Sequence, residues 1–338
     1  MKTLDARKMC ACLLLGSMSL AGAVEYRATE ISRAGGRAVE TPTDSGEVVG
    51  FTFRNGGRIP TRWSRLQGFQ EDPLVSGIAS YYVDRISPES YVVGIMNGAG
   101  GFPTNHIYDQ QTGQLTAIPS GPGQGSIMQV IDHQNESQML ISWRTEFSDI
   151  WLNYTKSNGV WSYTPLGNSG RGYSLGSDGA VYGNSAAEGA VRATRWLNGT
   201  RTLFSVPVGT ANSNVGGHLR DGSYVGLVID QAQRAYVARW TDINQLPTLT
   251  FVANNAFAGA NYEFASQSGT YVFEVGAKHY HWSPDFGVRQ IRDLVPGVIG
   301  ANESFSFTGM DKSGRFTIYS GVRDTYFYYE PVPEPATL

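Results

Sequence analysis

The sequence predicts an all-β fold: a seven-bladed β-propeller of four-stranded blades, with the ring closed by the N-terminal strand. An aromatic residue recurs at intervals of 42 to 47 residues, a period typical of propeller blades. Asp-Gly and Ser-Gly turns separate apolar, β-branched segments and favour hairpins. Gly, Tyr, Thr and Val are plentiful, and no convincing amphipathic helix follows the first residues. The predicted repeat anchors are Trp63, Tyr108, Trp151, Trp196, Trp240, Trp282 and a final Tyr at Tyr328 or Tyr329.

Residues 1–23 are predicted to be a signal peptide. Lys2, Arg7 and Lys8 precede an apolar run over residues 9–20, and residues 21–23 have the small-x-small form of a cleavage site. The run is too short for a stable membrane anchor. Both cysteines lie within it, so the mature chain has no thiol chemistry. We therefore expect an exported protein.

Charge narrows the range of partners. Removing residues 1–23 takes away three basic residues and one acidic residue, so the net charge falls from −3 to about −5. Lys and Arg are not clustered, which excludes a nucleic-acid-binding face and a polybasic membrane patch. We expect one domain, a ring over residues 24–331, followed by a short segment at 332–338.

Each repeat is interpreted as four pieces, and the first two are an inner segment that ends in a turn and an apolar strand. Gly accepts a positive φ, and Asp bonds its own backbone, so both residue types suit the turn. We therefore interpret the turn carboxylates as structural rather than catalytic; they are Asp44, Asp178, Asp221 and Asp311. A Gly recurs in the apolar strand, and we expect it to allow close packing between neighbouring sheets. These glycines are Gly50, Gly94, Gly183 and Gly226.

The third piece carries the aromatic anchor, as in Thr194-Arg195-Trp196. Period-two alternation sends the Trp and the residue before it to opposite faces of the strand. We expect one Trp per unit to pack between blades. A stripe of sugar-stacking tryptophans is the alternative interpretation, although aromatic residues repeated at the fold's own spacing are more often core.

The fourth piece is a strand after a Gly- or Asn-containing turn, which completes a four-stranded blade. The third copy is degenerate, because residues 132–141 lack the turn Gly, but Trp151 keeps the phase. The predicted outer strands are Gln114–Ile118, Val160–Leu166, Thr200–Phe204 and Val288–Leu294.

The two ends of the chain predict how the ring closes. After the last anchor the chain reaches Pro331 with no room for a fourth strand, whereas Glu25–Ile31 alternates like the outer strands. We therefore expect the N-terminal strand to complete the last blade and to remove exposed sheet edges.

Units of the form Asp-x-Gly-x-Val-Val-Gly, followed by a strand ending in Trp and a Gly turn, resemble the HAF repeats of exported bacterial proteins. The resemblance covers nearly all of the chain after residue 23. The name-giving His-Ala-Phe is replaced, for example by Arg192-Ala193-Thr194 and Tyr236-Val237-Ala238.

The segment 332–338 resembles the opening of a PEP-CTERM sorting signal, with the motif Pro333, Glu334 and Pro335. In that family an apolar membrane helix and a basic cluster follow, and an exosortase processes the tail. Both later parts are missing, so either the given chain is cut short or the protein is released without an anchor. The resemblance implies export from a Gram-negative bacterium that makes extracellular polysaccharide, with an exosortase as partner if the full tail exists.

The sequence contains no phosphate loop, nucleophile elbow, His-Glu-x-x-His or cysteine cluster. It therefore predicts no catalytic, cofactor-binding or metal-binding residues. His279 and His281 are spaced to face one side of a strand, but no third ligand lies nearby in the sequence, and we interpret them as lining a blade face or loop.

Two function classes follow. The first is a non-catalytic extracellular or cell-surface propeller that binds or organises the exopolysaccharide matrix, with polysaccharide or a surface protein as partner. The alternative is a glycoside hydrolase or polysaccharide lyase whose carboxylates come from different blades and meet at the axis. Two or three carboxylates, or a His, Tyr and Arg group, converging in one axial funnel would favour the enzyme.

Overall fold

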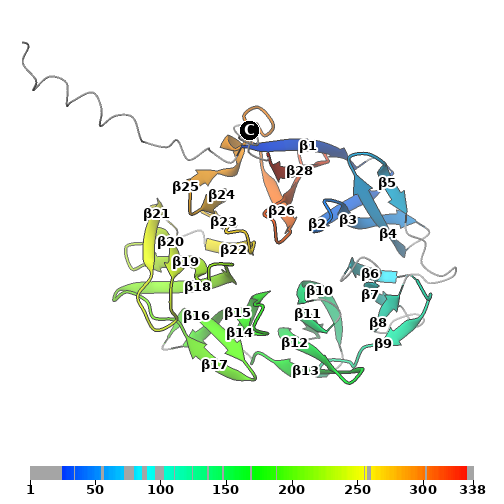
Figure 1. Ribbon diagram of the computed structural model, residues 1–338, viewed down its shortest axis with the longest axis horizontal. Coiled ribbons are helices and arrows are strands. Elements are labelled where there is room, and N and C mark those ends of the chain that lie inside the picture. Colours follow the sequence, from blue (N-terminus) through cyan, green and yellow to red (C-terminus); the bar gives the residue numbers. More distant parts are fainter. Residues whose placement is uncertain are drawn as a thin grey trace, which may run out of the picture.

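A computed structural model shows seven small antiparallel sheets arranged around a central axis (Figure 1). It describes residues 25–332 except 34, 55–56, 72–79, 86–89, 96–102, 110, 124, 135–136, 147, 168–169, 188, 255, 257–259 and 301–302. The predicted signal peptide and the Pro333-Glu334-Pro335 motif lie outside these residues. No helix in the described part of the chain has the length and hydropathy needed to span a membrane.

Each blade has four strands, numbered from the axis outward. Blade 1 is β2 (Arg37–Pro42), β3 (Val48–Arg54), β4 (Gly57–Ser64) and β5 (Gly68–Glu71). Blade 2 is β6 (Ser80–Arg85), β7 (Ser90–Ile95), β8 (Thr104–Asp109) and β9 (Leu115–Ala117). Blade 3 is β10 (Gly125–Gln134), β11 (Gln138–Thr145), β12 (Asp149–Ser157) and β13 (Val160–Pro165). Blade 4 is β14 (Gly170–Leu175), β15 (Val181–Ala187), β16 (Ala190–Leu197) and β17 (Thr200–Leu203).

The remaining blades follow the same order. Blade 5 is β18 (Thr210–His218), β19 (Tyr224–Asp230), β20 (Ala235–Trp240) and β21 (Thr248–Ala253). Blade 6 is β22 (Ala260–Ala265), β23 (Tyr271–Val275), β24 (Lys278–Ser283) and β25 (Gly287–Gln290), followed by a 3₁₀ turn, η2 (Ile291–Asp293). Blade 7 is β26 (Phe305–Met310), β27 (Phe316–Ser320), β28 (Thr325–Pro331) and β1 (Tyr26–Ser32).

The predicted ring closure is confirmed. Strand β1 pairs with β28 along its whole length, from Tyr26 opposite Pro331 to Ser32 opposite Thr325. The amide of Val332 also donates to the carbonyl of Glu25 over 2.7 Å. The last blade is therefore built from both ends of the chain, which leaves no unpaired strand edge between them.

The anchor residues are buried in most blades. Trp63, Tyr108, Trp196, Trp240 and Trp282 are each at most 8% exposed. They pack between blades, as expected: the Trp240 ring lies 5.2 Å from the ring of Phe204 in blade 4, measured between centroids. In blade 7 Tyr329, fully buried opposite Phe316, holds the corresponding register position.

Trp151 departs from this pattern. It is partly exposed, pairs with Ser142, and lies under the guanidinium of Arg171 at 5.2 Å. The anchor position in blade 3 belongs to Tyr154, which is fully buried opposite Met139 at the start of the second strand. Both aromatics fit the 42-to-47-residue interval, so the period alone selected the wrong one.

One outer strand also differs from its prediction. The segment expected as strand Val288–Leu294 is extended only to Gln290 and then turns into η2. The reason is burial, since Ile291 has no exposed surface and packs in the core of blade 7. The 3₁₀ turn thus begins the crossing to the next inner strand.

Candidate functional site

The inner strands share a bulge that shapes the axis. In six blades the pairing between the first and second strands skips one residue of the first strand, always at the same register position. In blade 4 the skipped residue is Tyr173, two residues before the strand ends. A bulge bends its strand and re-aims the side chains around it. The skipped residues are Glu40, Ile131, Tyr173, Gly216, Glu263 and Thr308.

In blades 1, 4 and 5 the repeated glycine lies opposite the inner strand beside the bulge. A Cβ added to Gly50, Gly183 or Gly226 would lie 1.9 to 2.1 Å from a carbonyl oxygen of the inner strand of the same blade. The close approach is therefore within one blade, and not between neighbouring sheets as the sequence suggested. Blades 3, 6 and 7 have the same bulge but carry Ile141, Phe273 and Ile318 at this register position. The lack of room for a Cβ is therefore a property of the backbone in blades 1, 4 and 5.

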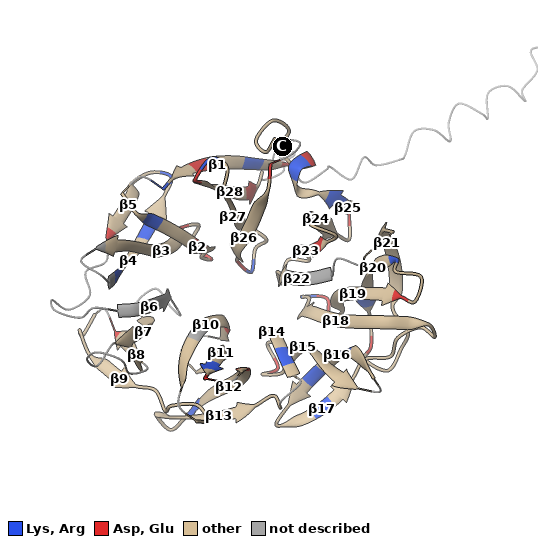
Figure 2. Cartoon of the chain, turned by 180° about the vertical axis from the view of Figure 1, so that it is seen from behind, with Lys and Arg blue, Asp and Glu red and all other residues tan. Residues whose placement is uncertain are grey.

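A funnel opens at the axis. Its cavity volume is about 360 Å³, and all seven blades contribute to its wall. Four carboxyl groups and one Lys are among the side chains that line it. Over the whole ring, Lys and Arg are spread over several blades (Figure 2). The titratable side chains of the lining are Glu40, Asp44, Tyr91, Asp132, His133, Tyr173, His218, Asp311 and Lys312. The uncharged polar and aromatic groups include Gln129, Gln134, Ser174, Phe264, Gln267 and Thr308.

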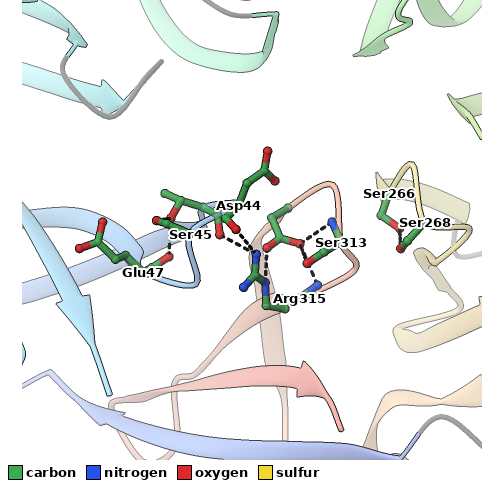
Figure 3. Close-up of polar contacts among 9 residues, drawn as sticks. Asp44, Ser45, Glu47, Ser266, Ser268, Ser313 and Arg315 are labelled. Carbon is green, nitrogen blue, oxygen red and sulfur yellow. Dashed lines mark hydrogen bonds and ion pairs between the residues drawn. The ribbon is translucent and has the colours of Figure 1, made fainter. Parts of the chain in front are cut away.

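Hydrogen bonds between blades hold the rim of the funnel. Arg315 of blade 7 donates to the carboxylate of Asp311 and to the backbone carbonyls of Thr43 (3.0 Å) and Asp44 (2.8 Å) in blade 1 (Figure 3). Asp311 also accepts from the amide and hydroxyl of Ser313, each over 2.8 Å. The carboxylate of Asp311 is thus committed to its own turn, and burial raises its pKa.

Asp132 fastens blade 3 to blade 4. Its Oδ2 accepts the amide of Leu175 and its Oδ1 accepts the amide of His133, both over 2.7 Å. Burial raises the pKa of Asp132 to about 6, although these two bonds and Lys312 oppose the rise. Both carboxylate oxygens therefore already bind backbone amides.

His133 lies next to Asp132 in the funnel wall. Burial, and secondarily the positive charge of Lys312, lowers the pKa of His133 to about 4, while Asp44 acts in the opposite direction. The imidazole is therefore neutral at pH 7. Its Nδ1 is buried without a hydrogen-bond partner among the described residues, and the same holds for Oγ of Ser174.

Aromatic rings form another part of the wall. His218 stacks on Tyr224 with ring centroids 4.9 Å apart. The hydroxyl of Tyr173 accepts the side-chain amide of Asn184 over 2.8 Å, and burial raises its pKa. Tyr91 is buried to 1% exposure at its place in the lining. The funnel thus offers ring faces beside amide and hydroxyl groups.

The turn carboxylates outside the funnel behave as the turn interpretation predicts. Asp178 accepts the amide of Ala180 over 3.0 Å and pairs with Arg195 at 2.6 Å. Asp221 accepts the amide of Ser223 over 2.9 Å and pairs with Arg239. In these two blades the Arg before the anchor Trp closes the turn.

His279 and His281 both face blade 7. The His279 ring lies 4.5 Å from that of Phe305, and Nε2 of His281 is 3.1 Å from the hydroxyl of Tyr26. Burial lowers the pKa of His281 to about 3. Within the part of the chain that the structure describes, no three His, Cys, Asp or Glu side chains come together in a group that could hold a metal ion.

No family model and no curated protein matches the chain. Solved structures do match its fold. An oligogalacturonate lyase in complex with manganese is 9% identical, with a TM-score of 0.54 over 92% of this chain and 97% of that one. YCF48 bound to D1 peptide is 10% identical, with a TM-score of 0.51 over 93% of this chain and 100% of that one.

A post-proline cleaving enzyme from Rickettsia typhi is 11% identical, with a TM-score of 0.50 over 94% of this chain and 51% of that one. This chain thus spans about half the length of that enzyme, and 52% of a TolB from Acinetobacter baumannii (14% identity, TM-score 0.34, 61% of this chain). At such identities the likenesses show the propeller fold alone, because one fold carries many functions.

Proposed function

We propose that this protein is a non-catalytic, exported propeller that binds a saccharide of the extracellular polysaccharide matrix in its axial funnel. The observation that carries the proposal is the lining, which combines rings such as Tyr173 and Phe264 with amide and hydroxyl groups such as Gln134, Gln267 and Thr308. Sugars present apolar C–H faces and many hydroxyls, which such groups complement.

The size of the funnel favours a small ligand. A volume of about 360 Å³ lies at the lower end of ligand pockets and leaves room for roughly one or two sugar units. His133 Nδ1 and Ser174 Oγ are buried and lack hydrogen-bond partners among the described residues, so a ligand hydroxyl gains a bond from either atom only if the funnel wall shifts to expose it.

The engagement of the carboxylates favours binding over catalysis. Asp311 is committed to Ser313 and Arg315, and Asp132 to the amides of His133 and Leu175. A general acid or a nucleophile needs an oxygen directed at the substrate. These two groups instead hold turns and blades together.

A polysaccharide-cleaving enzyme is the alternative, and two observations favour it. Among the described residues, four carboxyl groups from three blades line the one funnel, namely Glu40, Asp44, Asp132 and Asp311. The pKa of Asp132 is the second observation. A carboxyl with a pKa of about 6 keeps a proton near neutral pH and suits a general acid. This alternative requires Asp132 to release one backbone amide when substrate binds.

The proposed location rests on sequence resemblance. Residues 1–23 have the pattern of a signal peptide, and Pro333-Glu334-Pro335 that of a sorting motif. We propose export to, or release from, the surface of a Gram-negative bacterium, with an exosortase as the processing partner of a complete tail.

The test is incubation of the purified protein with the producing organism's own polysaccharide, following retention on the polymer and release of shorter chains. We expect retention without release. Gln267→Trp fills the funnel and should abolish retention, whereas Thr202→Trp, at an exposed position of β17, should not. Chain release that is lost in Asp132→Asn would establish the enzyme instead, and neither retention nor release would point to a protein partner.

A further inference from the structure

The seven outer strands differ in how well they are protected against pairing with another strand. Sheet edges are normally blunted by charged residues, Pro or shortness. Strands β1, β5, β17 and β25 contain Arg or Glu, β13 ends in Pro165, and β9 has three residues. Among the seven described outer strands, β21 alone has six residues with neither charge nor Pro.

Strand β21, Thr-Leu-Thr-Phe-Val-Ala, is built for pairing. β-Branched and aromatic residues favour an extended strand, and an uncharged six-residue segment of this kind is a typical pairing template. It hydrogen-bonds to β20 on one side and ends its sheet on the other. Figure 1 shows it on the outer perimeter of the ring, clear of the axis.

Apolar side chains surround this edge. Leu249 and Phe251 on β21 are 36% and 52% exposed, and Val208 and Leu246 in the adjoining loops are more exposed still. The two loops are joined by the amide of Ser205, which donates to Ile243 over 2.9 Å. Leu249 and Phe251 are two residues apart on β21, so their side chains lie on the same face of the strand, and exposed apolar groups of this kind mark an interaction surface.

We propose that β21 pairs antiparallel with β21 of a second copy of this chain, which forms a symmetric dimer with one continuous eight-stranded sheet. An isologous interface brings each surface onto itself, so it must be free of like-charge contacts. β21 contains no charge, Arg239 on β20 is paired with Asp221, and Arg234 in the turn before β20 is paired with Asp230.

Edge pairing supplies backbone hydrogen bonds, while side chains supply specificity. In the dimer the outward amides and carbonyls of β21 bind their counterparts, and Leu249 and Phe251 leave water. Val208 and Leu246 extend the contact toward the area that a stable dimer needs.

The test is light scattering of the purified protein across a wide concentration range. We expect a species of twice the 36.8 kDa chain mass. Leu249→Lys and Phe251→Lys should each weaken the dimer by roughly tenfold or more, because each brings like charges of the two copies close together near the two-fold axis. Val160→Lys, on the outer strand of blade 3 and 69% exposed, should leave it unchanged. At concentrations where the wild type is monomeric, all variants should melt at the wild-type temperature.

Hydrogen exchange separates strand pairing from contact by side chains alone. The amides of β21 should become protected as concentration rises, while those of β13 stay unprotected. A monomer at every concentration overturns the proposal. So does a dimer that survives both β21 substitutions, or one whose β21 amides exchange as fast as those of the monomer.

Discussion

The inner and outer rims of the ring obey different constraints. At the inner rim, six blades carry the same bulge at the same register, and neighbouring blades are joined by bonds such as that from Arg315 to Thr43. At the outer rim the strands range from three to seven residues, and their sequences share little.

The difference shows which part of the repeat keeps the same backbone geometry from blade to blade. In blade 4 the inner strand presses on the second strand of the same blade, so a Cβ added to Gly183 would lie 1.9 Å from the carbonyl oxygen of Arg171. Outer strands lie far apart and face solvent, so they are free to diverge. An outer strand with unusual properties, such as β21, therefore merits a functional explanation.

The largest expected effect contrasts two aromatics in one blade. Trp240 on β20 has no exposed surface and donates from its indole to the carbonyl of Ser205 over 2.7 Å. Trp240→Ala should lower the free energy of unfolding by about 3–5 kcal/mol, measured by denaturant titration. Phe251→Ala, one strand further out, should cost about 1 kcal/mol or less. If the two substitutions lower the free energy of unfolding equally, the outer strand is as important for stability as the buried anchor.

A second prediction addresses the bulge. Gly183→Ala places a Cβ against the carbonyl of Arg171 and should destabilise the fold by about 1–3 kcal/mol, because the inner strand must shift. Thr202→Ala, on the exposed outer strand of the same blade, should change stability by no more than about 0.5 kcal/mol. Thermal unfolding of both variants measures the contrast, and an unchanged Gly183→Ala would contradict the role of the bulge.

Strand β1 is an outer strand, but its Tyr26 is buried against His281 of blade 6. The pH dependence of stability tests this contact. Burial, and then Arg289, lowers the folded pKa of His281 to about 3, so the folded state keeps this ring neutral against Tyr26. The unfolded chain protonates it near pH 6.5. Its contribution to stability is therefore complete above pH 6.5 and is lost as pH falls toward 3, at up to about 1.4 kcal/mol per pH unit.

The His281→Phe variant should show a correspondingly shallower loss of stability between pH 6.5 and pH 4, measured by denaturant titration at several pH values. His106→Gln, in blade 2, serves as the matched control and should retain the wild-type slope. If both substitutions leave the slope unchanged, His281 does not stay neutral in the folded state.

The smallest expected effect concerns the ion pairs on the turns. Arg239 and Asp221 are 36% and 49% exposed, and water and salt screen such pairs. Arg239→Met keeps the apolar stem and should cost less than about 1 kcal/mol, less still in high salt. A larger loss of folding free energy that does not change with salt would mean that the Arg239–Asp221 pair is shielded from water.

Most of the fold could be predicted from the sequence, because period, turn chemistry and strand alternation are local signals. The blade number, the four strands per blade and the closure by Tyr26–Ser32 all followed from them. The errors arose where tertiary packing chose between local options. Tyr154 rather than Trp151 fills the anchor position, and Ile291 leaves its strand to reach a core.

The funnel could not be predicted in the same way. Asp132, His133 and Lys312 lie in two blades far apart in sequence, and only the closed ring brings them near one another. The bulge also changes which inner residues face the axis, and no pattern in the inner segments reveals it. One sequence position could have indicated the funnel lining: the position just before the first turn of each repeat. His133, Leu175 and His218 hold this position in three blades, and all three line the funnel.

The pairing of β1 with β28 also sets the order in which the molecule can assemble. Residues 26–32 leave the ribosome first, yet their partners at 325–331 are made last. Blades 1 to 6 consist of consecutive strands and can form in sequence, but blade 7 must await nearly the whole polypeptide. This longest-range contact should make ring closure the slow step of folding. Until that step the early strand remains unpaired.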